Sequence, residues 1–329
     1  MGECSPKTTI WSKLVAINKG ESLKAVERGT MDFSHRLLAF LQRNLSAVCR
    51  PIQFGVAAIE YWLLDAWWLL RGFQKPSAEE VANVADNVTI MFKSFERQKQ
   101  AKALVKSILK YYPGVRIVIA DDSAKPLTVP NCSDVNKLKI IKMPFNSGLC
   151  KGLNLALAEI ETPFMVRLDD DVLFTRRTDL ARELRFLLAH SEVDLVGMPW
   201  IDACKAISTN RDIKIYMRID MREAPLPLKM PHATKIDNEH IVLGKVSNAY
   251  LARTESIRKV GWDDNIRMID HHDFFYRAAG ILVSVLSLDS VLFHNHNFFS
   301  PHYNRYRSDW KGDAAYLRRV RYNRRSTRV

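Results

Sequence analysis

The pattern of apolar and polar positions divides the chain into two parts. Residues 31–73 carry apolar side chains at helical spacing and predict two helices, interrupted at Pro51 and ended before Pro76. The polar stretch 74–86 predicts a linker. From residue 87 onward, short β-branched runs alternate with amphipathic stretches, which indicates strands alternating with helices. Because these strands are almost continuously apolar, we expect an α/β domain with a mostly parallel sheet.

Four strands and two helices are predicted within the first half of this domain. The strands are "NVTIMFKSF", "VRIVIADDS", "KLKIIKMP" and "PFMVRLDDD", and the helices are "QAKALVKSILKYY" and "GLCKGLNLALAEI". In open α/β sheets, ligands bind beyond the carboxyl ends of the strands. Polar residues stand there after the first, second and fourth strands, which predicts a site at that edge of the sheet: Lys93, Ser94, Asp121, Asp122 and Asp169 to Asp171.

The hydrophobic pattern and the distribution of charge divide the chain into three expected regions. With 329 residues and 37.8 kDa, the chain can bury a full core, and 47% apolar residues argue against disorder. We expect a helical N-terminal segment over 1–80, a catalytic domain over 86–299 and a basic tail over 300–329. The net charge is +13, of which +7 falls in the tail, where nine Lys/Arg face two Asp. No nucleic-acid fold signature accompanies the tail, so we expect no nucleic acid partner.

The tail and the second N-terminal helix both predict contact with a membrane surface. The residues of the tail that fit an anionic lipid surface are Tyr316, Arg318, Arg319, Arg321, Tyr322, Arg324, Arg325 and Arg328. Residues 52–73 are rich in Trp and Leu, but Glu60 and Asp65 lie in their middle. A central carboxylate costs about 2.5–3.5 kcal/mol in a spanning helix, so this segment is expected to lie in the interface or to pack on the domain.

The five cysteines are scattered, without a Cys-x-x-Cys motif. An odd, dispersed set is typical of reduced thiols in a cytosolic protein rather than of a disulfide framework. Together with the apolar N-terminal helix and the basic C-terminal tail, the reduced cysteines predict a cytoplasmic protein. We expect it to lie peripherally at the inner face of a membrane, in preference to a Golgi-type lumenal placement.

The stretch "MVRLDDDVLF" places Asp169, Asp170 and Asp171 side by side at the end of a buried strand. Like charges at this distance raise the cost of ionising one another. A bound cation would remove that cost, whereas a solvated polar loop would tolerate it. The stretch alone leaves both interpretations open.

Three motifs in series decide between them. "IADDS", "LDDDVLF" and "GWDDNIRMIDHHDFFYRAAG" follow one another at the spacing of the GT-A glycosyltransferases. The chain resembles the family-2-like members of that superfamily, and among them the β-1,4-N-acetylgalactosaminyltransferases of the ganglioside type, over residues 86–296. The resemblance implies a Rossmann-like GT-A fold and a metal-dependent, inverting transfer. A hexose or N-acetylhexosamine would pass from a nucleotide-sugar, expected to be a UDP-sugar, to a hydroxyl group of a glycan or lipid-linked acceptor.

The resemblance also assigns a metal site. Asp169 and Asp171 take the places of the Asp-x-Asp pair that holds Mn²⁺ or Mg²⁺, and Asp170 between them lies on the donor side. His294 in "VLFHNHN" is expected to complete the site, with His296 as the alternative. Hard dications prefer carboxylate and phosphate oxygens, and a dication offsets the charge that develops on a departing diphosphate.

On the same basis, the donor is expected to contact the loops after the first two strands and the following turn. Asp122 is expected to contact the nucleotide base of the donor. Asp121 either contacts the donor or positions the loop. The relatives carry Arg-Asn after the second glycine of the turn, where this chain has Leu153-Asn154, and Lys151 is the expected substitute. The donor-binding residues implied are Phe92, Lys93, Ser94, Arg97, Asp121, Asp122, Gly148, Lys151, Asp169, Asp170, His271 and His272.

The segment "HHDFF" matches the one that supplies the catalytic base in the relatives, which assigns Asp273 as the base. His271 or His272 would orient Asp273 or touch the donor. Trp262 fits either an acceptor wall or the core. Two other functions remain open: a sugar nucleotidyltransferase on a similar sheet, and a non-enzymatic, basic adaptor that binds membranes.

Overall fold

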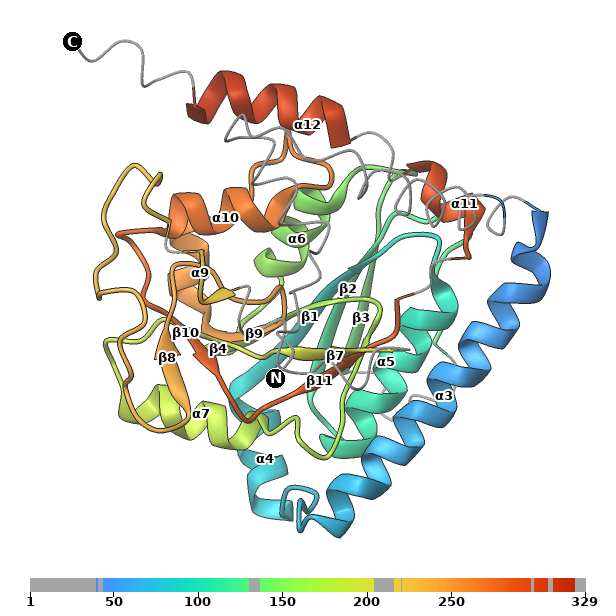
Figure 1. The fold of residues 1–329 in the computed structure, drawn as a ribbon, viewed down its shortest axis with the longest axis horizontal. Helices are drawn as coiled ribbons and strands as arrows, with labels where there is room; N and C mark the ends of the chain where they lie inside the picture. The colour runs from blue at the N-terminus through green and yellow to red at the C-terminus, as the bar shows by residue number, and fades with distance from the viewer. Residues whose placement is uncertain are drawn as a thin grey trace, which may run out of the picture. The chain divides into compact units, whose positions relative to one another are not determined.

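The computed structural model describes residues 44–129, 137–203, 216–219, 221–296, 299–306 and 310–322, together with Phe40. The residues described between 52 and 296, with those from 302 onward, form one compact unit. At its centre lies an eight-stranded sheet of order β3-β2-β1-β4-β9-β6-β10-β8 (Figure 1). Its strands are β1 Val88–Ser94, β2 Arg116–Asp121, β3 Leu138–Lys142, β4 Phe164–Asp169, β6 Leu195–Gly197, β8 His240–Val242, β9 Tyr250–Arg253 and β10 Ser284–Ser287.

The sheet is mixed but mostly parallel. β3, β2, β1 and β4 pair in parallel, β9 runs antiparallel to both β4 and β6, β10 is parallel to β6, and β8 closes the edge antiparallel to β10. All four strands predicted from the sequence are present within a few residues of their expected bounds. The predicted α/β class, with a mostly parallel central sheet, is therefore confirmed.

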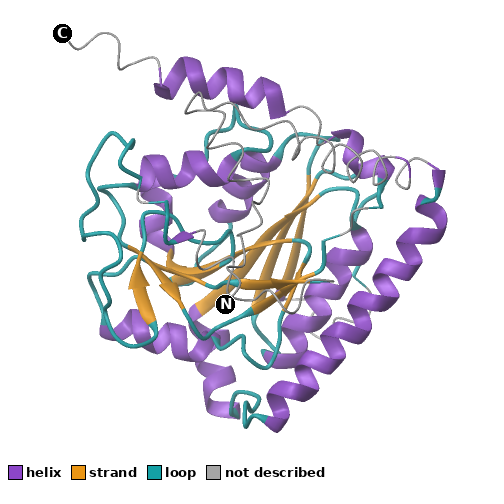
Figure 2. Cartoon of the chain, viewed as in Figure 1, coloured by secondary structure: helices purple, strands orange, loops and turns teal. Residues whose placement is uncertain are grey.

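Helices cover both faces of the sheet (Figure 2). Alternate residues of β1 divide between the two faces, as the two-residue period of a strand requires. Ile90 and Phe92 pack with α5 (Gln98–Tyr111) and α7 (Leu180–Ala189), whereas Met91 belongs to the core under α6 (Leu149–Ala158), α9 (Thr254–Val260) and α10 (Asp270–Ala278). Both predicted helices, α5 and α6, are thus buried along one side, and the sheet's carboxyl edge is left to the loops.

A second, three-stranded sheet crosses that edge, in the order β5 (Val172–Leu173), β11 (Leu292–His294) and β7 (Trp200–Asp202). His294 of β11 stands in register with Asp202 of β7 and Val172 of β5. The backbone N–H of Asn295 also donates to the carbonyl of Asp171 at 2.7 Å. This small sheet therefore brings Asp171, Asp202 and His294, which lie far apart in the sequence, to one place.

The N-terminal segment differs from the prediction in two respects. Helix α3 (Ser46–Leu70) continues through Pro51. Because Pro51 lies near the start of the helix, it removes only one backbone hydrogen bond, in the second turn. The predicted linker contains α4 (Ala78–Asn87), which begins with a capping box between Ser77 and Glu80. Residues 1–39 of the predicted helical segment lie outside the described residues. Among the helices that are described, none has the length and apolar character needed to cross a bilayer.

The C-terminal region is not a free basic tail over its described length. It contains α11 (Pro301–Asn304), α12 (Trp310–Leu317) and a short π-helical turn, η4 (Arg318–Tyr322). Arg321 forms ion pairs with Asp263 at 2.7 Å and Asp273 at 2.9 Å, and the Tyr316 hydroxyl donates to Asp263 at 2.9 Å. These two side chains, assigned above to a lipid surface, instead attach α12 and η4 to the domain. Arg324, Arg325 and Arg328 lie outside the described residues.

Candidate active site

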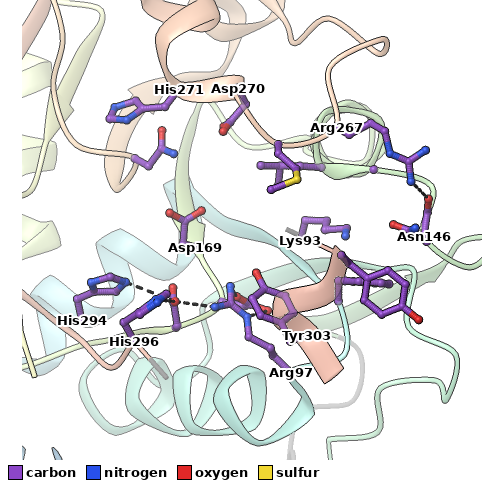
Figure 3. A pocket seen from close by; sticks show the side chains of 18 of the residues that line it. Lys93, Arg97, Asn146, Asp169, Arg267, Asp270, His271, His294, His296 and Tyr303 are labelled. Atoms are coloured by element: carbon purple, nitrogen blue, oxygen red, sulfur yellow. Dashed lines mark hydrogen bonds and ion pairs between the residues drawn. The ribbon is translucent and has the colours of Figure 1, made fainter. Parts of the chain in front are cut away.

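A cavity of about 580 Å³ lies beyond the carboxyl ends of β1 and β4, at the edge predicted from the sequence (Figure 3). Nine residues predicted to form the site line it: Lys93, Arg97, Gly148, Asp169, Asp170, Asp171, His271, His294 and His296. Among the described residues, eleven others also line it: Phe95, Asn146, Leu149, Trp200, Asn248, Arg267, Met268, Asp270, Tyr303, Arg305 and Tyr306.

Two of the three adjacent aspartates share one buried arginine. Arg97 Nη1 lies 2.7 Å from Asp171 Oδ2, and the same guanidinium contacts both carboxylate oxygens of Asp170. Burial raises the pKa of Asp170 to about 6, although Arg97 opposes the rise. For Asp171, burial is outweighed by Arg97 and His294, which hold its pKa well below the usual range. Arg97 thus allows two neighbouring carboxylates to stand together in a buried position.

Arg167 of β4 is fully buried and joins the third aspartate to a fourth. Its Nη1 lies 2.8 Å from Asp169 Oδ1, and its Nη2 lies 2.9 Å from Asp270 Oδ2, at the start of α10. Burial raises the pKa of Asp270 to about 6, with Arg167 opposing the rise and Asp169 adding to it. Figure 3 shows both carboxylates directed into the cavity. Arg97 and Arg167 therefore contact all four carboxylates directly, and Asp171 also contacts His294 and His296.

A candidate metal centre is formed by Asp171, His294 and His296, each of which offers one ligand atom within 4.8 Å of the others. Asp171 Oδ2 lies 3.4 Å from His294 Nε2 and 3.4 Å from His296 Nδ1. His294 Nδ1 contacts Asp202 Oδ1 at 2.6 Å, the carboxylate–histidine arrangement that orients metal-ligating imidazoles. One carboxylate and two imidazoles, one of them held by a second carboxylate, fit a divalent transition-metal ion.

This cluster differs from the predicted metal pair. Asp171 and His294 belong to it, and His296 joins them, but Asp169 is held by Arg167 instead. Asp202 was missed by the sequence reasoning, because only the pairing of β7 with β11 brings it to His294.

The residues predicted to bind the nucleotide divide between the cavity and its supports. Lys93 lines the cavity and pairs with the fully buried Asp122, which also accepts from Gly148 N at 3.1 Å. Burial lowers the pKa of Lys93 and raises that of Asp122. Gly148 adopts φ +106°, which a side chain would strain, so this turn requires glycine. Asp122 therefore holds the Lys93 side chain and the Gly148 turn in place.

Four other predicted donor residues lie outside the cavity lining. Phe92 is buried in the core and Ser94 is fully buried, while Lys151 is exposed on α6. Asp121 accepts from the Ser123 hydroxyl at 2.6 Å and from Leu127 N at 2.7 Å. Asp121 thus positions the loop after β2, the second of its two predicted roles.

Two other cations of the cavity, Arg267 and Arg305, were not assigned to the site from the sequence. Leu153, which stands where the resemblance led us to expect arginine, is fully buried in the core. Arg267 and Arg305 line the cavity, and Arg267 Nη2 donates to the Asn146 carbonyl at 2.6 Å. Tyr303 lies under Arg97, with its ring centroid 4.4 Å from the guanidinium carbon. The segment after β11 therefore supplies part of the cavity wall.

The structure places Asp273, the predicted base, outside the cavity. One of its oxygens accepts from Arg277 Nε at 2.7 Å, and the other accepts from Arg321 Nε at 2.9 Å. The contact with Arg321 holds α10 to η4. His272 is likewise absent from the cavity lining, and His271 lines it with its Nε2 bonded to the Val246 carbonyl at 2.6 Å. Asp270, three residues earlier on α10, is the carboxylate of this helix that faces the cavity.

Trp262 belongs to the core rather than to an acceptor wall. It is buried and stacks on Phe274 with ring centroids 5.5 Å apart. Trp200, at the start of β7, lines the cavity instead, with its ring centroid 5.1 Å from that of His294. Trp200 therefore offers an aromatic surface to a sugar ring beside the candidate metal centre.

The start of α10 is fixed from a distance by Asp313 of α12. Ile269 at the N-cap position makes no side-chain cap, and the buried Asp313 carboxylate accepts from the backbone N–H groups of Arg267, Met268 and Ile269 at 2.7–3.1 Å. Asp270 directly follows these three residues as the first residue of α10. The contacts of Asp313 therefore fix the position from which the Asp270 carboxylate reaches the cavity.

We expect Asp313→Ala to destabilise the protein by about 1–3 kcal/mol, the cost of leaving buried N–H groups without an acceptor, and to slow turnover by misplacing Asp270. Thermal unfolding and steady-state kinetics measure the two effects. Asp313→Asn keeps one carbonyl acceptor and should lie between the wild type and Asp313→Ala. Full turnover in Asp313→Ala would show that the cap does not position Asp270.

Comparison with known proteins agrees with this geometry. Residues 88–240 match the sequence model described as Glycosyl transferase family 2. The chain is 33% identical over 206 residues to β-1,4 N-acetylgalactosaminyltransferase 1 of Homo sapiens, covering 61% of this chain and 37% of that protein. It is 30% identical over 217 residues to β-1,4 N-acetylgalactosaminyltransferase 2 of Mus musculus, covering 65% and 40%. The chain thus spans well under half the length of these relatives.

Solved structures give a looser likeness. S. aureus TarS 1-349 superposes with a TM-score of 0.48 at 18% identity, covering 63% of this chain and 60% of that chain. The mannosyltransferase PcManGT from Pyrobaculum calidifontis gives a TM-score of 0.45 at 18% identity, covering 78% and 69%. Residues 88–240 therefore match glycosyl transferase family 2, and over about two thirds of its length the chain is similar to these two glycosyltransferases.

Proposed function

We propose that this protein is a metal-dependent, inverting glycosyltransferase that moves a hexose or N-acetylhexosamine from a UDP-sugar to a hydroxyl group of a glycan or lipid-linked acceptor. One observation carries the proposal. The metal-ligand cluster of Asp171, His294 and His296 faces the same cavity as Asp270, a buried carboxylate held by Arg167. Such a transfer needs a cation for the leaving diphosphate and a base for the acceptor.

The chain's own cations would bind the diphosphate. Lys93, Arg267 and Arg305 line the cavity, and guanidinium groups make strong, charge-assisted hydrogen bonds to phosphate oxygens. A dication bound by Asp171, His294 and His296 would supply Lewis-acid stabilisation of the charge on the departing diphosphate. Because two of these three ligands are imidazoles, Mn²⁺ fits the set better than Mg²⁺, which prefers oxygen ligands.

Asp270 is the base in this proposal. The acceptor oxygen forms a bond to the anomeric carbon as the bond from that carbon to the diphosphate oxygen breaks, and the acceptor proton passes to the Asp270 carboxylate. Arg167 Nη2 holds one oxygen of Asp270, and the carboxylate is directed into the cavity, where it can accept the proton (Figure 3). A pKa near the working pH makes a carboxylate an effective general base. Asp273, with both oxygens paired to arginines, supports α10 in this account.

The pKa of Asp270, raised to about 6, predicts the pH dependence of the reaction. Below pH 6 the carboxylate is mostly protonated and cannot accept the acceptor's proton, so kcat should fall about tenfold for each pH unit on the acid side. The rate should reach a plateau above pH 7. Single-turnover rates between pH 5 and 8 at saturating Mn²⁺ test this expectation, and a limb that stays flat down to pH 5 would contradict it.

The names of the relatives suggest the sugar class. Both are N-acetylgalactosaminyltransferases, which supports an N-acetylhexosamine as the first donor to test. Trp200 beside His294 offers a face on which an acceptor or donor sugar ring can stack. The cavity's base and ligand cluster favour an enzyme over a purely basic adaptor. Release of pyrophosphate from a nucleoside triphosphate and a sugar phosphate would instead support the nucleotidyltransferase alternative.

A donor panel tests the proposed function. The protein is incubated with Mn²⁺ and individual nucleotide-sugars without acceptor, and slow release of the nucleoside diphosphate is followed. We expect release from one or a few UDP-sugars, abolished by a chelator and restored by added Mn²⁺. Release that is unaffected by the chelator would contradict metal dependence, and release from GDP-sugars alone would contradict the assigned nucleotide.

A further inference from the structure

The outer face of α3 carries a continuous apolar stripe. Residues 52, 56, 59, 63, 67 and 70 follow one another at intervals of three or four and so share one side of the helix. The large apolar side chains exposed between residues 52 and 70 are Ile52, Val56, Ile59, Trp62, Leu63, Trp67, Leu69 and Leu70. Soluble proteins rarely expose a contiguous apolar surface of this kind without a partner for it.

The opposite face of α3 is fixed to the domain. Asp65 accepts from the Tyr111 hydroxyl at 2.6 Å and from Lys110 Nζ at 3.0 Å, both on α5, and Trp68 is buried. The Tyr61 hydroxyl donates to the Phe174 carbonyl at 2.7 Å. Asp65, one of the two carboxylates that argue against a spanning helix, therefore points to the protein, while the stripe residues are exposed on the other side.

Positive charge lies on α5, the helix that packs beside α3, and at the end of α3 itself. Lys102, Lys106 and Lys110 recur every four residues on one face of α5, and Lys110 Nζ lies 5.5 Å from the Tyr61 ring centroid of α3. Figure 1 shows α3 and α5 side by side. At the end of the helix, Arg71 stands over the Trp67 ring at 4.6 Å. Tryptophan and leucine side chains flanked by basic groups are typical of helices that lie in the interface of an anionic bilayer.

From this combination we propose that the outer face of α3 between Ile52 and Leu70 docks on an anionic lipid surface, with the helix lying in the plane of the interface. The inner face of the same helix packs against the small sheet of the active site, since Ala57 contacts the cluster of Phe293, and Gln53 Nε2 donates to the His296 carbonyl at 2.6 Å. Docking would therefore hold the candidate metal centre next to the membrane surface. This second step rests on the proposed function and suits a lipid-linked acceptor.

Sedimentation of the full chain with vesicles tests the docking. Ile59 and Leu188 of α7 are matched exposed residues, at 62% and 59% exposure, and only Ile59 belongs to the stripe. With vesicles of phosphatidylcholine and phosphatidylserine, we expect Ile59→Glu to weaken binding about tenfold or more and Leu188→Glu to leave it unchanged. Lys102→Glu/Lys106→Glu should weaken binding to these vesicles and not to phosphatidylcholine alone, and added salt should have the same effect.

Three results would overturn the proposal: a wild-type protein that binds neither vesicle, equal losses for Ile59→Glu and Leu188→Glu, or a wild-type dimer that Ile59→Glu converts to a monomer without changing vesicle binding. The last would mean that a second copy covers the stripe. Donor hydrolysis measured without lipid separates this inference from the proposed function. Ile59→Glu should retain it, and its absence in the wild type would count against the transferase while leaving the vesicle result valid.

Discussion

Replacing Asp270 by asparagine should lower the rate of sugar transfer by about 10³-fold, within the range that a general base contributes. The amide cannot take the acceptor's proton, yet its oxygen can still accept from Arg167 Nη2, which lies 2.9 Å from the present carboxylate. Donor affinity should therefore change little, so that kcat falls while the donor Kd stays within a few fold. Single-turnover transfer and calorimetric titration with the nucleoside diphosphate measure the two quantities separately.

Asp273→Asn is the matched control on the same helix. Both carboxylates are buried on α10, but Asp273 pairs with Arg277 and Arg321 outside the cavity. Its replacement should lower the stability of α10 and η4 and reduce kcat far less than Asp270→Asn. If Asp273→Asn removes the chemical step and Asp270→Asn retains it, the base assigned from the sequence motif is the correct one and the assignment from geometry fails.

Replacing Asp171 by asparagine should remove the metal dependence of the enzyme along with most of its activity. Asp171 is the only carboxylate in the cluster with His294 and His296 among the described residues, and its loss leaves two neutral ligands. We expect Mn²⁺ affinity and kcat each to fall by about 10²-fold or more, beyond the 10- to 100-fold typical of an outer-shell residue. Isothermal titration with Mn²⁺ in the presence of uridine diphosphate gives the affinity.

Asp202→Asn provides the graded comparison, because Asp202 touches His294 Nδ1 and is not itself in the cluster. It should weaken Mn²⁺ binding by about 10- to 100-fold. Asp169→Asn should affect Mn²⁺ affinity less than Asp171→Asn, since Asp169 is not part of the cluster with the two histidines. An Asp169→Asn variant that loses the metal while Asp171→Asn keeps it would reverse this assignment.

The parts of the fold that were predicted correctly depend on local pattern. The four strands and α5 and α6 follow from apolar periodicity, and the position of the acidic triplet follows from the end of β4. The prediction of a linker before β1 was wrong, because the structure has helix α4 there. The sequence did contain a sign of this helix, since Ser77 and Glu80 have the spacing of a capping box.

The parts of the site that were missed depend on contacts between distant segments. On a helix of nine residues, the choice between Asp270 and Asp273 depends on how α10 is rotated, which Asp313 and Arg321 of the C-terminal segment determine. Likewise, Trp200 reaches the cavity only because β7 pairs with β11, while Trp262 is enclosed by α10. Sequence spacing does not specify these pairings. The kinds of side chain in the site, a carboxylate base and a tryptophan, were therefore predicted, but the individual residues that supply them were not.

The central claim is that a dication bound by Asp171, His294 and His296 holds the diphosphate of the donor. Pulsed electron paramagnetic resonance of Mn²⁺ bound to the full chain with uridine diphosphate detects its ligands directly. The account predicts magnetic coupling both to phosphorus and to imidazole nitrogen, with the nitrogen coupling lost in a His294→Ala/His296→Ala variant. Mn²⁺ that couples to phosphorus but to no imidazole nitrogen in the wild type would contradict it.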